Sequence, residues 1–423
     1  MGKTGESYTT ARRQIIRQVA QPSETSRAPH HFPGSIPAAA ALRALLSQAG
    51  IRNPHTGAPL SEAMVFGIAG GIGAGVFAFY YPKEDFSSFF IAGRHLWQDD
   101  LGWTRQALAR LGLTPVVKES AGVKPGERQL RELLEGGRPV MAWLDAAELP
   151  HRAMPAMFSG GAYHVVAVHG VDDAAATALV GDLADDPVPV PLTDLARARG
   201  RIKKFKNRLL AVDRAPGSPD LATLVQSGIR DCIDALTTCK MKNFRLDAFA
   251  NWAERLDGSK AADSWEKMFP PGHRLYQGLW SMTEYIEYYG TGGGLFRPMF
   301  AEFLEEAGTA LSDPALKTAA ARYAELGRGW TALAEAALPA QVPELAETRA
   351  LLARRSEHRA EGAGASAEVA ACWKALDEQA QRLKRKFPLD AAASTDLRRD
   401  LKQRVTGLHA GEVEALDILR RWL

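Results

Sequence analysis

Signals for β-strands are confined to the first half of the chain, and this asymmetry limits the fold more than any other feature. Short apolar or aromatic runs typical of strands occur up to Val212 and alternate with helical segments. A segment rich in proline and glycine follows at Ala215–Asp220, and only helical patterns come after it. The pattern predicts an α+β domain with a mixed or antiparallel sheet, followed by an all-α domain.

The domain boundaries follow from the same pattern. We expect residues 1–29 to form a flexible leader, residues 30–214 the α+β domain and residues 220–423 the helical domain. The strands of the first domain are predicted at Val76–Tyr81, Pro115–Val117, Pro139–Leu144, Tyr163–Val168, Ala178–Asp182 and Leu209–Val212. The helices of the second domain are predicted at Leu221–Leu236, Leu246–Leu256, Arg274–Tyr289, Met299–Ala307, Ala315–Ala337, Glu344–Ala360, Glu368–Lys386 and Asp396–Leu423.

Composition excludes several classes of function. The 52 basic and 49 acidic residues leave a net charge of +3, which is too balanced for a protein that coats nucleic acid. No apolar run approaches the ~18 residues of a membrane span, and the N-terminus lacks the apolar core of a signal peptide. Three cysteines are too few and too scattered for a disulfide framework or a zinc site. We therefore expect a soluble, cytoplasmic protein without a bound metal or cofactor.

A histidine and an aspartate on neighbouring strands form the strongest candidate for chemistry. His164 opens one predicted strand and Asp182 ends the next, so the two side chains can meet across a hairpin. The aspartate would then hold the imidazole in one tautomer, as a general base requires. Gly160 and Gly161 precede His164 and would let a substrate approach the backbone closely. The alternative is a histidine packed against the sheet and an aspartate that caps a turn.

No cysteine lies near this pair, so a serine is the only candidate nucleophile that the pattern offers. Ser35 stands just before a predicted helix at Ala38–Ala49, where the helix dipole and free N–H groups favour an anion. A serine followed by Pro37 is equally typical of an ordinary helix N-cap. Both interpretations remain open at this point.

Two glycine-rich segments are candidates for lining a pocket. Gly67–Gly75 lacks the lysine and serine of a phosphate loop and precedes a strand, which favours a close-packed backbone crossing beside a pocket. Gly290–Gly294 separates two helices; Glu284 and Tyr288 stand before it and Arg297 after it. Such a turn could line a polar pocket between the domains. Alternatively, Glu284 and Glu287 belong to a solvated helix face.

Two further features concern partners. The dense basic stretch Arg197–Arg208 is a solvated surface or a docking site for an acidic partner. The last helices carry more apolar residues than a surface helix needs, so they either pack on the helical domain or form a homodimer. We favour the homodimer.

These residues together resemble a known family. Residues from about 31 to 212 are similar to the butirosin-biosynthesis acyltransferase N-terminal domain family, through Leu60–Gly67, the glycine run after it, Gly160–Val166 and Gly181–Leu183. Residues from about 223 to 339 resemble the uncharacterised helical domain that often follows it, through Gly290–Pro298.

The resemblance implies a papain-like fold, in which a nucleophile at the start of a helix faces a histidine that a carboxylate orients. His164 and Asp182 match the latter two roles, whereas the segment Ser35–Ala41 stands where the family has its cysteine. Better-known members transfer an acyl group from a carrier-protein thioester to an amine. The substrate-binding residues are then expected to be Glu62, Gly70, Gly71, Gly161, Tyr163, Glu284, Tyr288, Gly293 and Arg297.

Three functions are compatible with the sequence. The first is an amide-forming acyltransferase of natural-product biosynthesis in which His164 is the base, Asp182 orients it, and Ser35 either acts as nucleophile or takes no part. Its partners would be an acylated carrier protein and a small-molecule amine. The second is a catalytically inactive papain-like scaffold that binds a small molecule or a biosynthetic partner. The third is a hydrolase that uses the same base with water.

Overall fold

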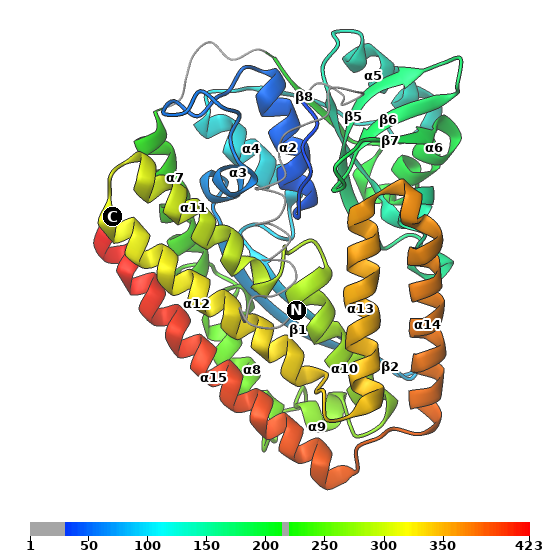
Figure 1. Cartoon of the computed structure of the whole chain (residues 1–423), viewed down its shortest axis with the longest axis vertical. Helices are drawn as coiled ribbons and strands as arrows, with labels where there is room; N and C mark the ends of the chain where they lie inside the picture. Colours follow the sequence, from blue (N-terminus) through cyan, green and yellow to red (C-terminus); the bar gives the residue numbers. More distant parts are fainter. Residues whose placement is uncertain (1–29, 214–219) are drawn as a thin grey trace.

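The computed structural model describes residues 30–213 and 220–423, and it has the α+β architecture that the sequence predicts. The predicted leader, residues 1–29, and most of the predicted boundary at 215–220 lie outside these residues. A sheet with its helices occupies one end of the molecule, and long helices fill the rest (Figure 1). Among residues 30–213 and 220–423, no helix is both long and apolar enough to cross a bilayer.

The larger sheet is antiparallel at every strand pair. Its strands follow the order β3-β8-β4-β5-β6-β7, and a separate two-stranded hairpin is formed by β1 and β2. The strands are β1 (Ile72–Tyr81), β2 (Phe86–Arg94), β3 (Pro115–Lys118), β4 (Val140–Asp145), β5 (Tyr163–Asp172), β6 (Thr177–Gly181), β7 (Val188–Pro191) and β8 (Leu209–Val212). Sequence patterns miss β2 and β7, because β2 mixes serines with aromatic residues and β7 contains two prolines.

Helices cover the sheet and form the whole of the second half. The helices of the first half are α2 (Pro37–Gln48), α3 (Glu62–Ile68), α4 (Asp100–Arg110), α5 (Val123–Leu134) and α6 (Leu192–Arg201). Those of the second half are α7 (Leu221–Thr237), α8 (Asp247–Leu256), α9 (Trp265–Met268), α10 (His273–Thr283), α11 (Arg297–Ala310), α12 (Pro314–Ala337), α13 (Pro343–Glu361), α14 (Ser366–Arg385) and α15 (Ala391–Trp422). Short 3₁₀ helices include η1 (Ala146–Glu148), η2 (Pro150–Arg152) and η8 (Ala363–Ala365). Helix α10 continues as a π-helical turn, η6 (Glu284–Tyr288).

Alternate residues of the central strands face two different cores. Val165 and Ala167 of β5 pack into the core that contains α2, whereas Val166 and Val168 pack into a second core beside α5 and α6. This alternation is the period of a strand buried on both faces. His164 has the parity of Val166 and lies opposite Leu144, which belongs to the second core.

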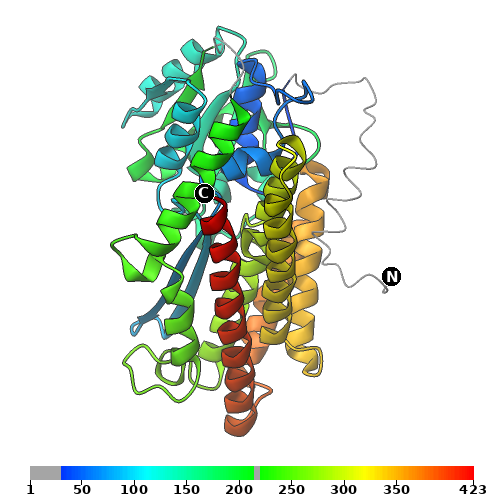
Figure 2. The same ribbon diagram turned by 90° about the vertical axis from the view of Figure 1, so that its left-hand side faces the viewer.

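The core that contains α2 extends through the helical half. The β1–β2 hairpin runs out of the first domain and lies among the helices of the second (Figures 1 and 2). Phe89 of β2 is fully buried there, with ring centroids 5.1 Å from Trp252 and 5.3 Å from Trp265. The two halves of the sequence therefore share one apolar core.

The last helix packs within the chain. Helix α15 lies against α12 and α8 (Figure 1), and its buried apolar residues belong to the same core as theirs. Trp422 at its end donates a hydrogen bond through Nε1 to Asp313, at 2.7 Å. Of the face that suggested a homodimer, Val413 is 38% exposed, and five residues are buried within the chain: Leu401, Val405, Leu408, Leu416 and Leu419.

Candidate functional site

Asp182 is the centre of a buried polar cluster at the end of β6. Its Oδ1 accepts a hydrogen bond from Nε2 of His164 at 2.8 Å, so the expected contact between the two is present. Its Oδ2 accepts from Nε2 of His151 at 3.0 Å, and Nη1 of Arg152 lies 3.4 Å away. Burial alone would raise the pKa of Asp182, but Arg152, His164 and the two histidine hydrogen bonds hold it well below its usual value. Asp182 is therefore ionised and only accepts hydrogen bonds.

The ionised carboxylate determines the tautomer of His164. Because Asp182 can only accept, Nε2 of His164 carries the hydrogen. Burial lowers the pKa of His164, although the charge of Asp182 opposes this shift, so the ring is neutral at pH 7. The lone pair then lies on Nδ1, which is the arrangement that a general base needs. The His164 side chain is only 4% exposed, so substrate must reach it between packed elements.

The start of helix α2 lies beside this cluster. The N–H of Gly34 donates to the carbonyl of Leu183, the residue after Asp182, at 3.2 Å. Ile36 occupies the N-cap position, so the prediction that Ser35 caps the helix is wrong. The cap is instead the carboxylate of Glu62, whose Oε1 accepts from the N–H groups of Ser35 at 2.8 Å and Ile36 at 2.7 Å. A carboxylate satisfies these free donors and complements the helix dipole better than a serine does.

Residue 34 has to be glycine for this cap to form. A Cβ on Gly34 would lie 2.8 Å from Oε1 of Glu62 and 2.7 Å from the Cβ of Ala40.

No hydrogen bond joins Ser35 to His164 in residues 30–213. The structure therefore brings Ser35 and Glu62 together at the helix start, and His164 and Asp182 together at the sheet.

Of the predicted glycines, Gly70 and Gly71 serve packing. Both have positive φ angles, and a Cβ on Gly71 would lie 2.5 Å from the ring of Phe300 in α11. A Cβ on Gly70 would overlap the ring of His95. Gly70 and Gly71 therefore let the backbone pack closely against His95 and Phe300. This agrees with the close-packed backbone crossing that was predicted for Gly67–Gly75.

Gly161 and Tyr163 lie on the surface of the loop and strand that carry His164. Tyr163 is 47% exposed and Nζ of Lys204 lies 3.8 Å from its ring centroid. Neighbouring residues of a strand point to opposite faces, so the Tyr163 side chain leaves the sheet on the side opposite His164. Gly161 is exposed, and a Cβ there would meet no atom closer than 3.7 Å.

The second glycine segment turns the chain inside the helical half. Arg297 is fully buried, and its Nε donates to Oε1 of Glu412 at 2.6 Å. Its Nη1 also donates to the carbonyls of Leu295 and Gly93. Arg297 therefore joins α11 to α15 and to the hairpin; the expectation that it lines a pocket is wrong. The N–H of Gly293 donates to Thr291, which closes the turn.

Glu284 and Tyr288 lie on the π-helical turn, and Glu284 is not a solvated residue. Both of its carboxylate oxygens accept from Nη2 of Arg355 in α13, at 2.7 and 2.6 Å. Burial raises the pKa of Tyr288, so its hydroxyl stays protonated. Single π-helical turns are frequent at functional sites. The turn thus places Glu284 against α13.

Four residues of this region were not found from the sequence: His151, Arg152, Arg355 and Arg359. The first two lie in η2, a single turn between β4 and β5, and the others lie in α13. Only their burial marks these residues as functional candidates, because arginine is almost never buried without a partner. Burial of this kind can be seen only in the three-dimensional structure. A small cavity of about 160 Å³ adjoins His151; its wall is formed by Pro150, His151, Val188, Pro189, Val190, Ala363 and Ser366.

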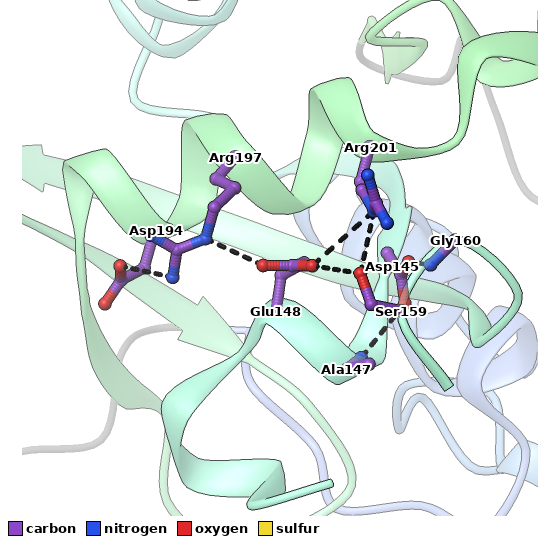
Figure 3. A network of polar contacts seen from close by, with 8 residues as sticks. All are labelled: Asp145, Ala147, Glu148, Ser159, Gly160, Asp194, Arg197 and Arg201. Carbon is purple, nitrogen blue, oxygen red and sulfur yellow. Dashed lines mark hydrogen bonds and ion pairs between the residues drawn. The ribbon is translucent and has the colours of Figure 1, made fainter. Parts of the chain in front are cut away.

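The basic stretch is largely paired within the first domain. Arg197 and Arg201 of α6 both reach Glu148, which also accepts from Ser159 at 2.5 Å (Figure 3). Asp145 accepts from the N–H groups of Ala147 and Gly160 beside them (Figure 3). Elsewhere in the stretch Arg199 is buried, and Arg208 pairs with Glu119. The exposed lysines of the stretch are Lys203, Lys204 and Lys206.

The three cysteines are free thiols in the second half of the chain. Burial raises the pKa of Cys232 to about 12 and also raises the pKa of Cys372, which makes both poor nucleophiles. In the part of the chain that the structure describes, no three His, Cys, Asp or Glu side chains are grouped as metal ligands.

Comparisons with known families agree with this architecture. Residues 38–183 match the family model described as butirosin biosynthesis protein H, N-terminal. Residues 193–361 match a domain of unknown function, DUF4872. This second match begins at α6, before the chain leaves the sheet, and ends with α13. No curated protein sequence matches the chain. The chain therefore contains a domain that matches the butirosin biosynthesis protein H N-terminal family at residues 38–183, followed by a DUF4872 domain at residues 193–361.

Proposed function

We propose that the chain is an amide-forming acyltransferase of natural-product biosynthesis in which His164 is the general base. The observation that supports this most is the hydrogen bond from Nε2 of His164 to an ionised Asp182, which leaves the lone pair on Nδ1. The family is named for a butirosin biosynthesis protein, which agrees with a role in natural-product assembly. The acyl donor would be a carrier-protein thioester and the acceptor a small amine.

The proposed reaction needs no covalent enzyme intermediate. A thioester is already activated, so the amine attacks its carbonyl carbon directly while Nδ1 of His164 takes a proton from the nitrogen. The C–N bond forms, the C–S bond breaks, and the proton passes to the departing thiolate. A positioned base contributes typically ~10²–10⁴-fold, and holding both substrates together contributes more. Ser35 has no part in this step, since no hydrogen bond connects it to His164 in residues 30–213.

Intact-mass analysis of acylated carrier proteins with candidate amines tests the proposal. We expect His164→Ala to reduce amide formation by about 10²–10⁴-fold. His169→Ala is the matched control, because it removes a histidine from the same strand that has no hydrogen bond to Asp182. Ser35→Ala should keep full turnover. An acyl adduct on Ser35, or equal activity of wild type and His164→Ala, would refute the mechanism.

A binding scaffold without catalysis is the second candidate, and the burial of His164 favours it. Both side chains of the pair are only 4% exposed, and Asp182 already has three polar neighbours. In that case the wild type forms neither amide nor free acid from any thioester. Release of free acid in the absence of an amine, lost in His164→Ala, would instead identify a hydrolase that uses the same base.

A further inference from the structure

Three arginines from two different parts of the chain lie around Asp182. Arg152 of η2 contacts Asp182, η2 packs against α14, and Trp373 of α14 lies under Arg355 and Arg359. Arg152 comes from η2 in the first half, while Arg355 and Arg359 lie one helical turn apart on α13. Arg355 and Arg359 both lie over the ring of Trp373, with Cζ atoms 4.3 and 5.4 Å from its centroid. The charges of Arg355, Arg152 and Asp182 all act on the pKa of Arg359, so these groups form one electrostatic unit.

The cluster has more guanidinium groups than carboxylates. Asp182 and Glu284 are the two carboxylates that pair with Arg152 and Arg355, respectively. No ion pair is present for Arg359 among the described residues, and burial lowers its pKa well below the usual value. A buried cation without a counterion is unfavourable, because desolvation is not offset by a nearby negative charge.

Several N–H donors of these arginines also have no acceptor. The Arg355 side chain is fully buried, yet its Nε and Nη1 have no hydrogen-bond partner within residues 30–213 and 220–423. The same holds for the buried Nε atoms of Arg152 and Arg359. Stacking on Trp373 satisfies the face of a guanidinium but leaves its in-plane donors unused. Buried donors are normally paired, so four unused ones in one cluster indicate an acceptor that the described residues do not supply.

We propose that Arg152, Arg355 and Arg359 bind an oxyanion of the substrate, either a carboxylate or a phosphate, beside His164. Planar guanidinium groups suit both anions because their N–H groups match the spacing of the oxygens. One added negative charge balances the cluster of three guanidinium groups and two carboxylates. As a substrate subsite this inference rests on the proposed function, but binding of the anion does not depend on turnover.

Thermal unfolding of the full chain, titrated with sodium acetate or inorganic phosphate at constant ionic strength, tests the site. We expect the unfolding midpoint of the wild type to rise saturably with one of these anions, and the responding anion identifies the class of oxyanion. Arg359→Gln should weaken the apparent affinity at least about tenfold, because one charge-assisted contact is lost. Arg359→Lys should restore part of the response.

Arg354→Gln is the matched control, because Arg354 precedes Arg355 on α13 and is exposed. Its anion response should equal that of the wild type. Without anion, Arg359→Gln should unfold at or above the wild-type midpoint, since it removes an uncompensated buried charge. The absence of a saturable response to either anion would overturn the proposal. So would an unchanged response in Arg359→Gln, or a midpoint for its anion-free form clearly below the wild type. Failure of acyl transfer alone would leave these binding results unaffected.

Discussion

The buried ion pair between Arg297 of α11 and Glu412 of α15 gives the sharpest test of how the helical half is held together. Both side chains are fully inaccessible, and Nε of Arg297 lies 2.6 Å from Oε1 of Glu412. The same oxygen accepts from Nε1 of Trp330 at 2.8 Å. Glu412→Gln keeps the shape of the side chain and an oxygen acceptor, but it removes the negative charge. The guanidinium is then left buried without a counterion.

Removing one partner of a buried ion pair typically costs about 3–5 kcal/mol. Glu414 is the internal comparison, because it lies two residues away on α15, pairs with Arg322 and is 68% exposed. Exposed pairs are usually worth about 0.2–1 kcal/mol. We therefore expect the free energy of unfolding to fall several times more for Glu412→Gln than for Glu414→Gln.

Urea denaturation of both single variants measures these differences in the free energy of unfolding. The double variant Arg297→Met with Glu412→Gln completes the comparison, because it leaves no buried charge and keeps an acceptor for Trp330. We expect it to be more stable than Glu412→Gln alone. Equal effects of Glu412→Gln and Glu414→Gln would refute the reasoning, as would a double variant that is no more stable than Glu412→Gln alone.

Three further predictions concern other parts of the molecule. Glu62→Gln should lower the free energy of unfolding by about 1–2 kcal/mol, because a charged acceptor of two helix N–H groups is lost; urea denaturation should show no such loss for the exposed Glu368→Gln on α14. Burial lowers the pKa of both His95 and His169 to about 4, so between pH 6.5 and 4 the unfolded chain binds more protons than the folded one. The free energy of unfolding should therefore fall as the pH drops through this range, by up to about 1.4 kcal/mol per pH unit for each histidine; a flat profile in urea denaturations from pH 7 to 5 would contradict this. Finally, changing the exposed Lys203, Lys204 and Lys206 to glutamate should raise the KM for a carrier-bound acyl donor but not for a small thioester. Equal effects on the KM of both donors would exclude a docking role for these lysines.

The fold class and the contact between His164 and Asp182 were accessible from the sequence because both depend on local pattern. Strand periodicity placed His164 at the start of β5 and Asp182 just after β6, and neighbouring antiparallel strands bring such positions together. The helices of the second half were found for the same reason. The hairpin strand Phe86–Arg94 was not predicted, because its mixture of serine and phenylalanine shows no buried face until the helices cover it.

The rest of the candidate site depends on contacts between distant parts of the chain. Glu284 and Arg355 are 71 positions apart, and Arg152 meets Asp182 across 30 positions. No local spacing rule connects such residues. The error at Arg297 has the same origin: an arginine after a glycine turn is usually exposed, and only the position of Glu412 on the last helix makes its burial favourable.

The shared core has a consequence for synthesis on the ribosome. Phe89 leaves the ribosome long before Trp252 and Trp265, the residues that enclose it. At roughly 5–20 residues per second, the delay is about 8–35 s. During that time the strands of the hairpin are an unpacked β-ribbon with apolar side chains, which is a template for pairing with other nascent chains. Slow translation between positions 90 and 270, or a shortage of chaperones, should therefore lower the yield of folded protein without any change in its final stability.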